Sequence, residues 1–519
     1  MSRSRQILIN AVAQWAVTGL SAILGLLIVP FLILKLGQDG YGLVVIILGI
    51  AGICALADMG ISGALARQLA ESLGRKDNDA FNEYASTASI INLAVGGACA
   101  LSVLLLAVPM ARAFRLPEAL FRDGVILLRT FGAAHVLLTF AMFTPRAVLA
   151  SHNRFDLACV IDAARRLMQT VGLFVVLSLT SLGLVGWALV CILVDTAVAG
   201  LLWRAAFRAE RRLRISQRWF RRGRVRSLYG LGGHLTVLQV SGQLSVSADP
   251  FILTACLGPA SVSFYRPPSQ AMGAISQLVM TLAGQLHPLA TQAHVQGDRE
   301  SLKRILFQGT KFTMLMGSVA CAIVISLAEP LCKVWLGGAL GEGYKTAAAV
   351  LTIQAVTALG AFAAGTQWPV LLGMRKTAFA AYGRLALALV NIAASWLLVR
   401  YARLGVIGVV IPTMVIELVW RPVLGWYVCR AVAFSVREYL QDAYLAPLMI
   451  GSAVAGLGLQ LRVLAPVKDP WSLALMASIL GGASAALIWF AGLSGAERKK
   501  VRGALQPLAA HPTAVARLG

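Results

Sequence analysis

Charged residues are scarce in this chain. Only 13% of its 519 residues are Asp, Glu, Lys or Arg, whereas soluble globular proteins carry about 25%. The mean hydropathy is +0.76, and the apolar runs are long enough for helices, which need about 20 residues to cross a bilayer. These values exclude a soluble globular protein and predict an all-α integral membrane protein.

Acidic residues are scarcer than basic ones, with 22 Asp and Glu against 46 Lys and Arg. The bases gather between two apolar runs, where Trp203–Leu228 holds ten arginines and one acid, Glu210. Positively charged loops stay in the cytoplasm, so this segment predicts a cytoplasmic linker and cytoplasmic termini. A nucleic-acid patch is disfavoured because no soluble basic domain is attached. Binding of anionic lipid headgroups is a modest side effect of the same charge.

Several chemical motifs are missing. The eight cysteines have no CxxC spacing, the six histidines are scattered without HExxH, and no GxxxxGK[ST] phosphate loop occurs. Cysteines in apolar runs are typical of small buried side chains, and the other two motifs are the usual marks of zinc proteases and of ATPases. The sequence therefore predicts no disulfide framework, no metal, no cofactor and no ATP hydrolysis.

The apolar runs predict about fourteen transmembrane helices. They lie at roughly 8–34, 41–66, 84–110, 123–149, 157–180, 183–206, 229–256, 266–292, 304–328, 345–373, 378–400, 404–429, 443–464 and 471–493. We expect an N-lobe at 1–206, the basic linker at 207–228, a C-lobe at 229–430, spans 13 and 14 at 431–495 and a cytoplasmic tail at 496–519. No connection is long enough to form a folded domain.

Matching residues recur at a separation of 221 or 222 positions. They are Leu36-Gly37 with Leu257-Gly258, Asp77 with Asp298, Pro109 with Pro330, Arg154 with Arg375, and Leu182–Gly186 with Leu404–Gly408. The repeated unit contains six spans, and an even number of spans returns the chain to its starting side. The two six-helix lobes should therefore be parallel and related by an axis along the membrane normal, with the last helix pair outside the repeat.

Polar side chains follow one face of the predicted eighth span. Arg266, Gln270, Gln277 and Thr281 fall within a stripe of about 100° at the helical spacing. Such a stripe is costly in hydrocarbon and should face protein or water. It favours a cavity lining over the alternative, hydrogen bonding between packed helices. Asn10 and Gln14 form a similar stripe in the first span.

The seventh span is the most polar one. Ser241, Ser245 and Asp249 recur at every fourth residue and so lie along one face. Asp249 precedes Pro250, which frees a backbone carbonyl and kinks helices. Asp249 is therefore a candidate for proton or cation coupling, with a structural salt bridge as the alternative.

Asp58 and Arg67 stand nine residues apart in the second span, which places them on opposite sides of a straight helix. They can face one cavity only if the helix bends at Gly60 or Gly63. Asp58 is a second candidate for ion coupling, with structural packing as the alternative. Arg67 is a candidate substrate-binding residue or a side chain that reaches the cytoplasmic interface.

Other charges within spans predict internal ion pairs. Asp162 stands three and four residues before Arg165 and Arg166, and Glu417 stands four before Arg421. Side chains at these spacings meet on one face of a helix. We expect both sets to neutralise each other rather than to bind a ligand.

The segment LGQDGYGLVVIILGIAGICALADMGISGALARQLAE resembles the second-span region of bacterial polysaccharide transporters. These are oligosaccharide flippases of the multidrug/oligosaccharidyl-lipid/polysaccharide exporter superfamily. The resemblance rests on Leu36-Gly37, Gly40–Gly42 and Asp58–Gly60, and on Asp249-Pro250, Leu257-Gly258 and Tyr265 in the second half. It extends over nearly the whole chain but is poor at naming the substrate.

This resemblance implies two six-helix lobes around a cavity lined mainly by spans 1, 2, 7 and 8. It implies alternating access, and a cargo of undecaprenyl-diphosphate-linked glycan moved across the bacterial inner membrane for O-antigen, capsule or exopolysaccharide synthesis. In relatives with fourteen spans the last pair helps to form a groove for the lipid tail. Membrane lipids are expected partners, polysaccharide polymerases and glycosyltransferases are candidate partners, and nucleic acid is not.

Three other functions remain open at this point. A multidrug or cation antiporter on the same fold would favour acidic sites, and a lipid II flippase is another relative. A membrane glycosyltransferase or polymerase belongs to a different class. Such enzymes usually carry catalytic groups on sizeable outer loops, and the outer loops here are short. We therefore expect a transporter, not an enzyme.

Overall fold

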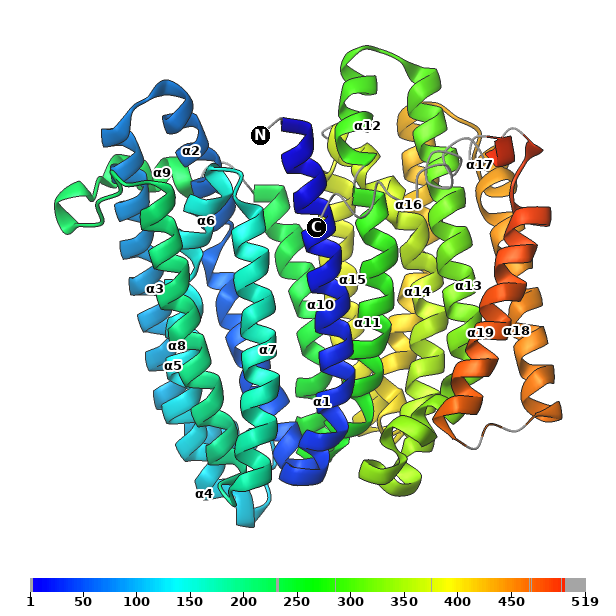
Figure 1. Cartoon of the computed structure of the whole chain (residues 1–519), viewed down its shortest axis with the longest axis horizontal. Coiled ribbons are helices and arrows are strands. Elements are labelled where there is room, and N and C mark those ends of the chain that lie inside the picture. Colours follow the sequence, from blue (N-terminus) through cyan, green and yellow to red (C-terminus); the bar gives the residue numbers. More distant parts are fainter. Residues whose placement is uncertain are drawn as a thin grey trace, which may run out of the picture. The chain divides into compact units, whose positions relative to one another are not determined.

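The computed structural model describes residues 3–229, 233–284, 286–374, 376–465, 467, 469–495 and 497–499, and of these it leaves aside the side chains of 3–18, 233–239, 246, 282, 284, 287 and 288. These residues form helices joined by short connections, without a strand (Figure 1). The chain divides into two compact units. The first unit holds Met1–Leu278, Trp335–Ile353 and Lys376–Ile416, and the second holds Val279–Val334, Gln354–Arg375 and Glu417–Gly519.

The elements follow one another along the chain with few interruptions. Up to residue 295 they are α1 Arg3–Cys54, η1 Ala55–Asp58, α2 Ile61–Arg75, α3 Asn78–Ala113, α4 Glu118–Leu127, η2 Leu128–Gly132, α5 Ala133–Ala141, α6 Phe143–Ser151, α7 Phe155–Leu179, α8 Gly183–Ala209, η3 Gln217–Trp219, α9 Arg222–Tyr229, α10 Gly233–Leu257, η4 Pro259–Ser261, α11 Val262–Gly284 and α12 Leu286–Val295. The rest are α13 Arg299–Leu340, η5 Gly341–Gly343, α14 Tyr344–Gly373, α15 Ala378–Arg400, α16 Ile407–Val432, α17 Val436–Leu440, η6 Gln441–Leu445, α18 Ala446–Leu464, α19 Pro470–Leu487 and η7 Ile488–Gly492.

Many of these helices are suited to a bilayer. In the described part of the chain, nine helical stretches are long and apolar enough to cross a membrane. One of them, Arg299–Gly373, is 75 residues long and therefore contains more than one crossing of about 20 residues. The predicted all-α membrane architecture is confirmed, while the number of fourteen spans stays a prediction.

The predicted repeat is visible in the local backbone. Gly37 has φ 74° and ψ 168° inside α1, and Gly258, 221 residues later, has φ 90° and ψ 166° at the start of η4. Asp77 and Asp298 each accept a bond from the amide three residues on, at 2.9 Å in both cases. Pro109 lies inside α3 as Pro330 lies inside α13. Positions matched by the sequence therefore share their local conformation.

The two corners that contain Gly37 and Gly258 pack against each other within the first unit. The Ala260 amide donates to Asp39 Oδ1 at 3.1 Å, and these two residues are 221 positions apart. The Ser263 hydroxyl donates to the Gln38 carbonyl at 3.0 Å. A residue that touches its own counterpart in a repeat lies beside the axis that relates the two copies, as at a two-fold interface.

The second unit docks α18 onto α13 through small residues. A Cβ added at Gly451 would lie 2.9 Å from the Ser318 side chain, and one added at Gly458 would lie 2.4 Å from Ser326 Oγ. The same two serines donate to carbonyls of α18, at 2.8 Å to Pro447 and 3.2 Å to Ala455. Glycine and serine at such spacing let helix backbones approach closely, as is common in membranes.

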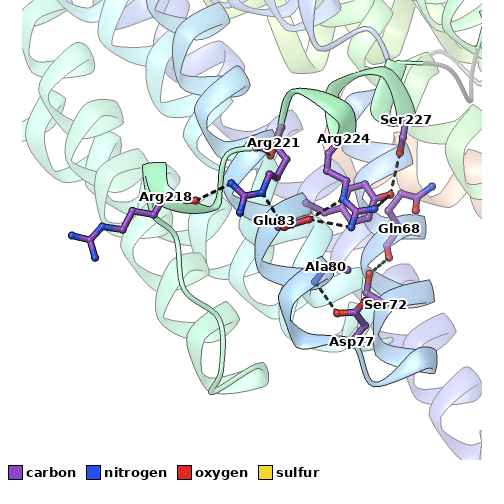
Figure 2. Close-up of polar contacts among 11 residues, drawn as sticks. Gln68, Ser72, Asp77, Ala80, Glu83, Arg218, Arg221, Arg224 and Ser227 are labelled. Carbon is purple, nitrogen blue, oxygen red and sulfur yellow. Dashed lines mark hydrogen bonds and ion pairs between the residues drawn. The ribbon is translucent and has the colours of Figure 1, made fainter.

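The basic linker is folded along α3 (Figure 2). The Arg214 amide donates to Asn82 Oδ1 at 2.9 Å, and the Asn82 side chain donates to the Arg212 carbonyl at 3.2 Å. Ser86 donates to the Arg214 carbonyl at 3.1 Å. Glu83 forms ion pairs with Arg221 and Arg224, at 3.2 and 3.0 Å. We call residues 210–221 the strap, because side chains on one face of α3 hold its backbone in place.

Candidate functional site

A fully buried carboxylate organises the middle of the first unit. Asp195 on α8 accepts from Arg165 Nε at 2.9 Å and from Gln169 Nε2 at 3.2 Å, both on α7. His135 Nδ1 on α5 lies 2.7 Å from the other Asp195 oxygen. A buried charge is stable only when it is paired and hydrogen-bonded, and Asp195 has several such partners. It therefore joins three helices.

The predicted pairing within α7 is wrong. Asp162 binds Arg146 of α6 in a bidentate geometry, at 2.9 and 2.6 Å, and Arg165 turns to Asp195 instead. Spacing along one helix identifies only the partners on that helix, and here the better-placed guanidinium comes from a neighbour. The predicted pair Glu417–Arg421 is confirmed, with Arg421 Nε 2.5 Å from Glu417 Oε2.

These pairings leave Arg166 without a counter-ion. Its side chain is exposed, and among the described residues no carboxylate forms an ion pair with it. Its electrostatic neighbours are Arg165, Asp162, Arg266 and Asp195. The two carboxylates in that set are engaged by Arg146 and Arg165. Arg166 and Arg266 act on each other electrostatically, and neither has an ion pair of its own among the described residues.

Arg266 is the first residue of the polar stripe of α11. It lies in the first turns of α11, shortly after the corner that contains Gly258. Its side chain is half-buried, and its charge acts on the buried Tyr41 of α1 and on Tyr265. It has no ion pair in the part of the chain that the structure describes. Together with Arg166 it makes a cationic pair contributed by α7 and α11.

Helix α1 contacts both helices that carry this pair. Its Phe31 ring lies 5.0 Å from the Phe174 ring of α7. A Cβ added at Gly25 would lie 2.2 Å from Gln270 Nε2, so the missing side chain makes room for Gln270 of α11. Gln270 thus packs against the backbone of α1, which fits the alternative of helix packing for this member of the stripe.

Asp249 is buried on α10, where Tyr265 donates to its Oδ2 at 2.7 Å. Its Oδ1 is also buried and has no hydrogen-bond partner among the described atoms. No salt bridge to Asp249 exists in this part of the structure, so its neighbour is a tyrosine rather than the cation that a structural salt bridge requires. A carboxylate oxygen left unsatisfied in the interior is costly, which is typical of a functional position.

The remaining members of the two stripes have mixed environments. Ser241 is buried, and its carbonyl accepts the Ser245 hydroxyl at 2.8 Å within the helix. Gln277 is exposed and Thr281 is half-buried. Thr281 lies in the part of α11 that belongs to the second unit. Arg266 is thus close enough to the α7 guanidinium of Arg166 to act on it electrostatically, whereas Ser245 is bound to its own helix.

The second span breaks between Asp58 and Arg67, as a shared cavity for them requires. Met59 and Gly60 both have left-handed backbones, and α2 starts at Ile61. Asp58 accepts from the Ser62 amide at 3.2 Å and from the Ser62 hydroxyl at 2.8 Å, so it caps α2 in the manner of an N-terminal helix cap. Arg67 is exposed on α2.

Two of the predicted site residues lie outside the description of side chains. These are Asn10 and Gln14 of the first span. The predicted cytoplasmic tail at 496–519 lies outside the described residues except for 497–499.

Arg166 is the residue that reasoning from the sequence missed. The number of charges gave no signal, because Arg146, Arg165 and Arg166 of α6 and α7 are matched by three carboxylates of α7 and α8, Asp156, Asp162 and Asp195. Arg166 is left over in the structure because Asp156 pairs with Arg154, which precedes α7. A guanidinium without a carboxylate partner attracts an anion, and arginine matches the oxygens of phosphate in a bidentate geometry.

Comparisons with known proteins identify the family and the fold. Residues 7–294 match the family model described as polysaccharide biosynthesis protein. The chain is 23% identical over 361 residues to the uncharacterized membrane protein EpsK of Bacillus subtilis strain 168, covering 67% of this chain and 68% of EpsK.

Two solved structures share the fold. One is the inward-facing conformation of a multidrug resistance MATE family transporter of the MOP superfamily, with TM-score 0.67, 16% identity, and coverage of 82% of this chain and 99% of that one. The other is the lipid II flippase MurJ in an inward closed conformation, with TM-score 0.65, 14% identity, and coverage of 93% and 99%. The fold is therefore that of membrane transporters rather than that of an enzyme.

These matches confirm the two-lobed transporter architecture and the resemblance noted in the sequence. The family model covers more than half of the chain. On that ground, this membrane protein belongs to the polysaccharide biosynthesis protein family.

Proposed function

We propose that this protein moves a polyprenyl-diphosphate-linked oligosaccharide across the bacterial inner membrane by alternating access. The glycan serves surface polysaccharide synthesis, such as that of O-antigen, capsule or exopolysaccharide. Both termini lie in the cytoplasm. Family membership supports a role in polysaccharide synthesis, and the shared fold supports transport.

The observation that carries this proposal is that Arg166 and Arg266 have no ion pair among the described residues and act on each other electrostatically. Two such cations favour the binding of a group with at least two negative charges. A lipid diphosphate has that charge, and its oxygens accept charge-assisted hydrogen bonds from guanidinium. We therefore assign the diphosphate to these two residues and sugar hydroxyls to the amide and hydroxyl groups of the α11 stripe.

Return of the empty transporter is coupled to an ion in this proposal. Asp249 supports it, because one of its buried oxygens has no partner among the described atoms. An intramembrane carboxylate that is not neutralised by a cation is a usual position for a proton or cation site. Asp58 is a weaker candidate, since its carboxylate already caps α2.

Three competing functions have less support. A drug antiporter for cations would place carboxylates where Arg166 and Arg266 lie. A lipid II flippase shares the diphosphate and so fits the same pair, and the match to that flippase covers 93% of this chain. It differs from our proposal only in the saccharide. A glycosyltransferase or polymerase is disfavoured because the fold is that of transporters.

The test is surface glycan in a strain that depends on this chain, normalised to the amount of protein in the membrane. We expect Arg166→Gln and Arg266→Ala each to reduce export by about 10- to 100-fold, because hydrogen bonds to charged groups contribute about 1.5–3 kcal/mol. Arg266→Lys should recover part of the export, since lysine lacks the planar fork. Arg266→Ala, Gln270→Ala and Gln277→Ala combined should abolish it.

Two controls accompany these variants. Ile275→Ala lies on the opposite side of α11 and should export normally. Arg122→Gln removes an exposed arginine of α4 and should also be silent. Full export by the triple alanine variant and by Arg166→Gln would reject the site.

A further inference from the structure

Eight arginines in and around the strap have side chains that form no ion pair with a described carboxylate of this chain. Of the ten in this region, Arg221 and Arg224 pair with Glu83. The other guanidiniums have no ion pair with a described carboxylate, and all of these side chains are exposed: Arg204, Arg208, Arg211, Arg212, Arg214, Arg218, Arg222 and Arg226. Figure 2 shows the Arg218 side chain directed away from Glu83.

The neighbouring acids are already engaged. Glu83 holds two arginines, and Glu210 accepts the Arg212 amide at 3.0 Å and lies 3.5 Å from His152 Nε2. The charge of the eight arginines must therefore be balanced by a group from outside the chain. Since their electrostatic repulsion opposes a fixed arrangement, an external anion also stabilises the folded strap.

The backbone that carries these arginines is held firmly. Buried Asn82, Ser86 and Thr87 of α3 bind the strap at three levels, the last through a bond of 3.1 Å from the Arg221 amide to Thr87 Oγ1. Leu213 of the strap is buried in an apolar cluster with Leu228. The arginines are thus presented by an ordered surface.

Helix α8 sets the depth of this surface relative to the bilayer. Its 27 residues span about 40 Å at 1.5 Å each, about 10 Å more than the hydrocarbon core. Its last turns, with Arg204 and Arg208, therefore extend into the headgroup region. Arg204 stands 11 residues after Leu193, which is about 20° away around the helix, and Leu193 is 67% exposed.

Arg204 thus continues the face of α8 that meets lipid. Trp203 and Phe207 stand at the same level with ring centroids 5.6 Å apart, and Trp is enriched where the membrane meets water. A soluble acidic protein or a nucleic acid would reach the strap but would not reach side chains on a lipid-facing helix surface.

We propose that Arg204, Arg208, Arg211 and Arg212, together with the exposed arginines of the strap, form a binding site for the anionic headgroups of phospholipids. The ligand is phosphatidylglycerol or another phospholipid with net negative charge in the leaflet at this end of α8. Several guanidiniums bind several headgroup phosphates, so one patch of anionic lipid is held beside the strap. This site is separate from Arg166 and Arg266.

The experiment uses the full chain in nanodiscs of phosphatidylcholine that contain a small fraction of spin-labelled phosphatidylglycerol. The fraction of motionally restricted label measures association, with spin-labelled phosphatidylcholine as the reference. The test variant carries Arg204→Gln, Arg208→Gln and Arg212→Gln. We expect its preference for phosphatidylglycerol to fall by at least about fivefold, the effect of a single basic residue near an anionic surface.

The control variant carries Arg122→Gln, Arg400→Gln and Arg403→Gln, which removes the same charge from exposed positions of α4, the end of α15 and the connection after it. It should keep the preference, and added salt should weaken the preference of the wild type. Equal retention or equal loss in both variants would overturn the lipid site. Displacement of phosphatidylglycerol by inorganic diphosphate at constant ionic strength would assign the arginines to a soluble phosphate and would also overturn it.

Discussion

Charged residues on α13 in the second unit and on α7 in the first unit are paired to different extents. In the second unit, Lys303 pairs with Glu438 at 2.7 Å, Lys311 pairs with Glu497 at 2.9 Å, and Arg462 pairs with Glu329. In the first unit, Arg165 is paired while the adjacent Arg166 is not. The pairs hold helices together, whereas the unpaired guanidinium is the one that we propose to bind the diphosphate.

Arg266 is half-buried, and a charge without a partner in such a position lowers stability. Arg166 is exposed, and the carboxylates near it are already engaged by Arg146 and Arg165. Paired charges such as Asp195 and Arg165 maintain the fold, whereas Arg166 and Arg266 act in transport in our proposal. Variants of the two kinds should therefore differ in stability.

The largest effect on stability is expected from Asp195→Leu. This change leaves Arg165 without its carboxylate, and breaking a buried pair costs about 3–5 kcal/mol. Thermal unfolding in detergent should show a marked loss of stability, or the protein should fail to accumulate. Arg166→Gln is the matched comparison, and it should unfold at the wild-type temperature. If the two variants were equally unstable, the distinction between paired and unpaired arginines would be lost.

A smaller loss is expected from Gly42→Ala. The added Cβ would lie 2.0 Å from the Pro259 carbonyl oxygen, and forced overpacking costs about 1–3 kcal/mol. The same thermal measurement should detect it. Gly63→Ala on α2 is the control, because a Cβ there has no neighbour within 4 Å. A neutral Gly42→Ala would show that the two corners do not pack as described.

In the second unit, Ser318→Ala should cost about 0.5–1.5 kcal/mol, the net contribution of one hydrogen bond. It removes the donor to the Pro447 carbonyl at 2.8 Å but leaves the close approach of Gly451 intact. Ser318→Val adds bulk against Gly451 and should be clearly worse. The order of the two variants in unfolding temperature checks whether α18 is held mainly by packing.

The smallest effect is expected from Trp335→Phe. Pro30 has no amide to donate to the Leu26 carbonyl, and the Trp335 indole supplies that bond at 2.7 Å. Losing it should cost about 1 kcal/mol. Pro30→Ala restores the internal donor, so Trp335→Phe should cost less in that background, and a double-mutant cycle measures the difference. Additive effects would contradict the pairing.

Topology is checked with single cysteines in a background without native cysteines. Gln217 of the strap and Ser181 between α7 and α8 are both exposed. Gln217→Cys should react with an impermeant reagent only from the cytoplasm, and Ser181→Cys only from outside. Reaction of both from one side would reject the proposed orientation.

Much of the fold was predictable because it depends on features that recur along the sequence, namely apolar runs and residues repeated at a separation of 221. Hydropathy predicted an all-α membrane protein, and the 221-residue separation matched Gly37 with Gly258, which have similar positive-φ backbones in the structure. The angular argument named a bend at Gly60 or Gly63 only as a condition for a shared cavity, and the structure has the break at Met59 and Gly60. These features depend on local residues, which a sequence displays directly.

The site was less predictable because its selection depends on contacts between helices. Asp162 could not be matched to Arg146 by spacing on one helix, and Asp249 was recognised without its tyrosine partner. The angular stripe found Arg266, but it did not distinguish Gln270 against α1 from a ligand contact. Arg166 could be identified as unpaired only once the ion-pair partners of the neighbouring carboxylates were known.

Binding of lipid diphosphate to the purified protein tests the central claim most directly. The measurement compares polyprenyl-diphosphate-linked saccharide with the corresponding monophosphate, for the wild type, Arg166→Gln and Arg266→Gln. We predict that the wild type prefers the diphosphate and that each variant loses about 10-fold or more of that preference, while both remain folded. Equal affinity for the two lipids in the wild type, or an unchanged preference in both variants, would contradict the account.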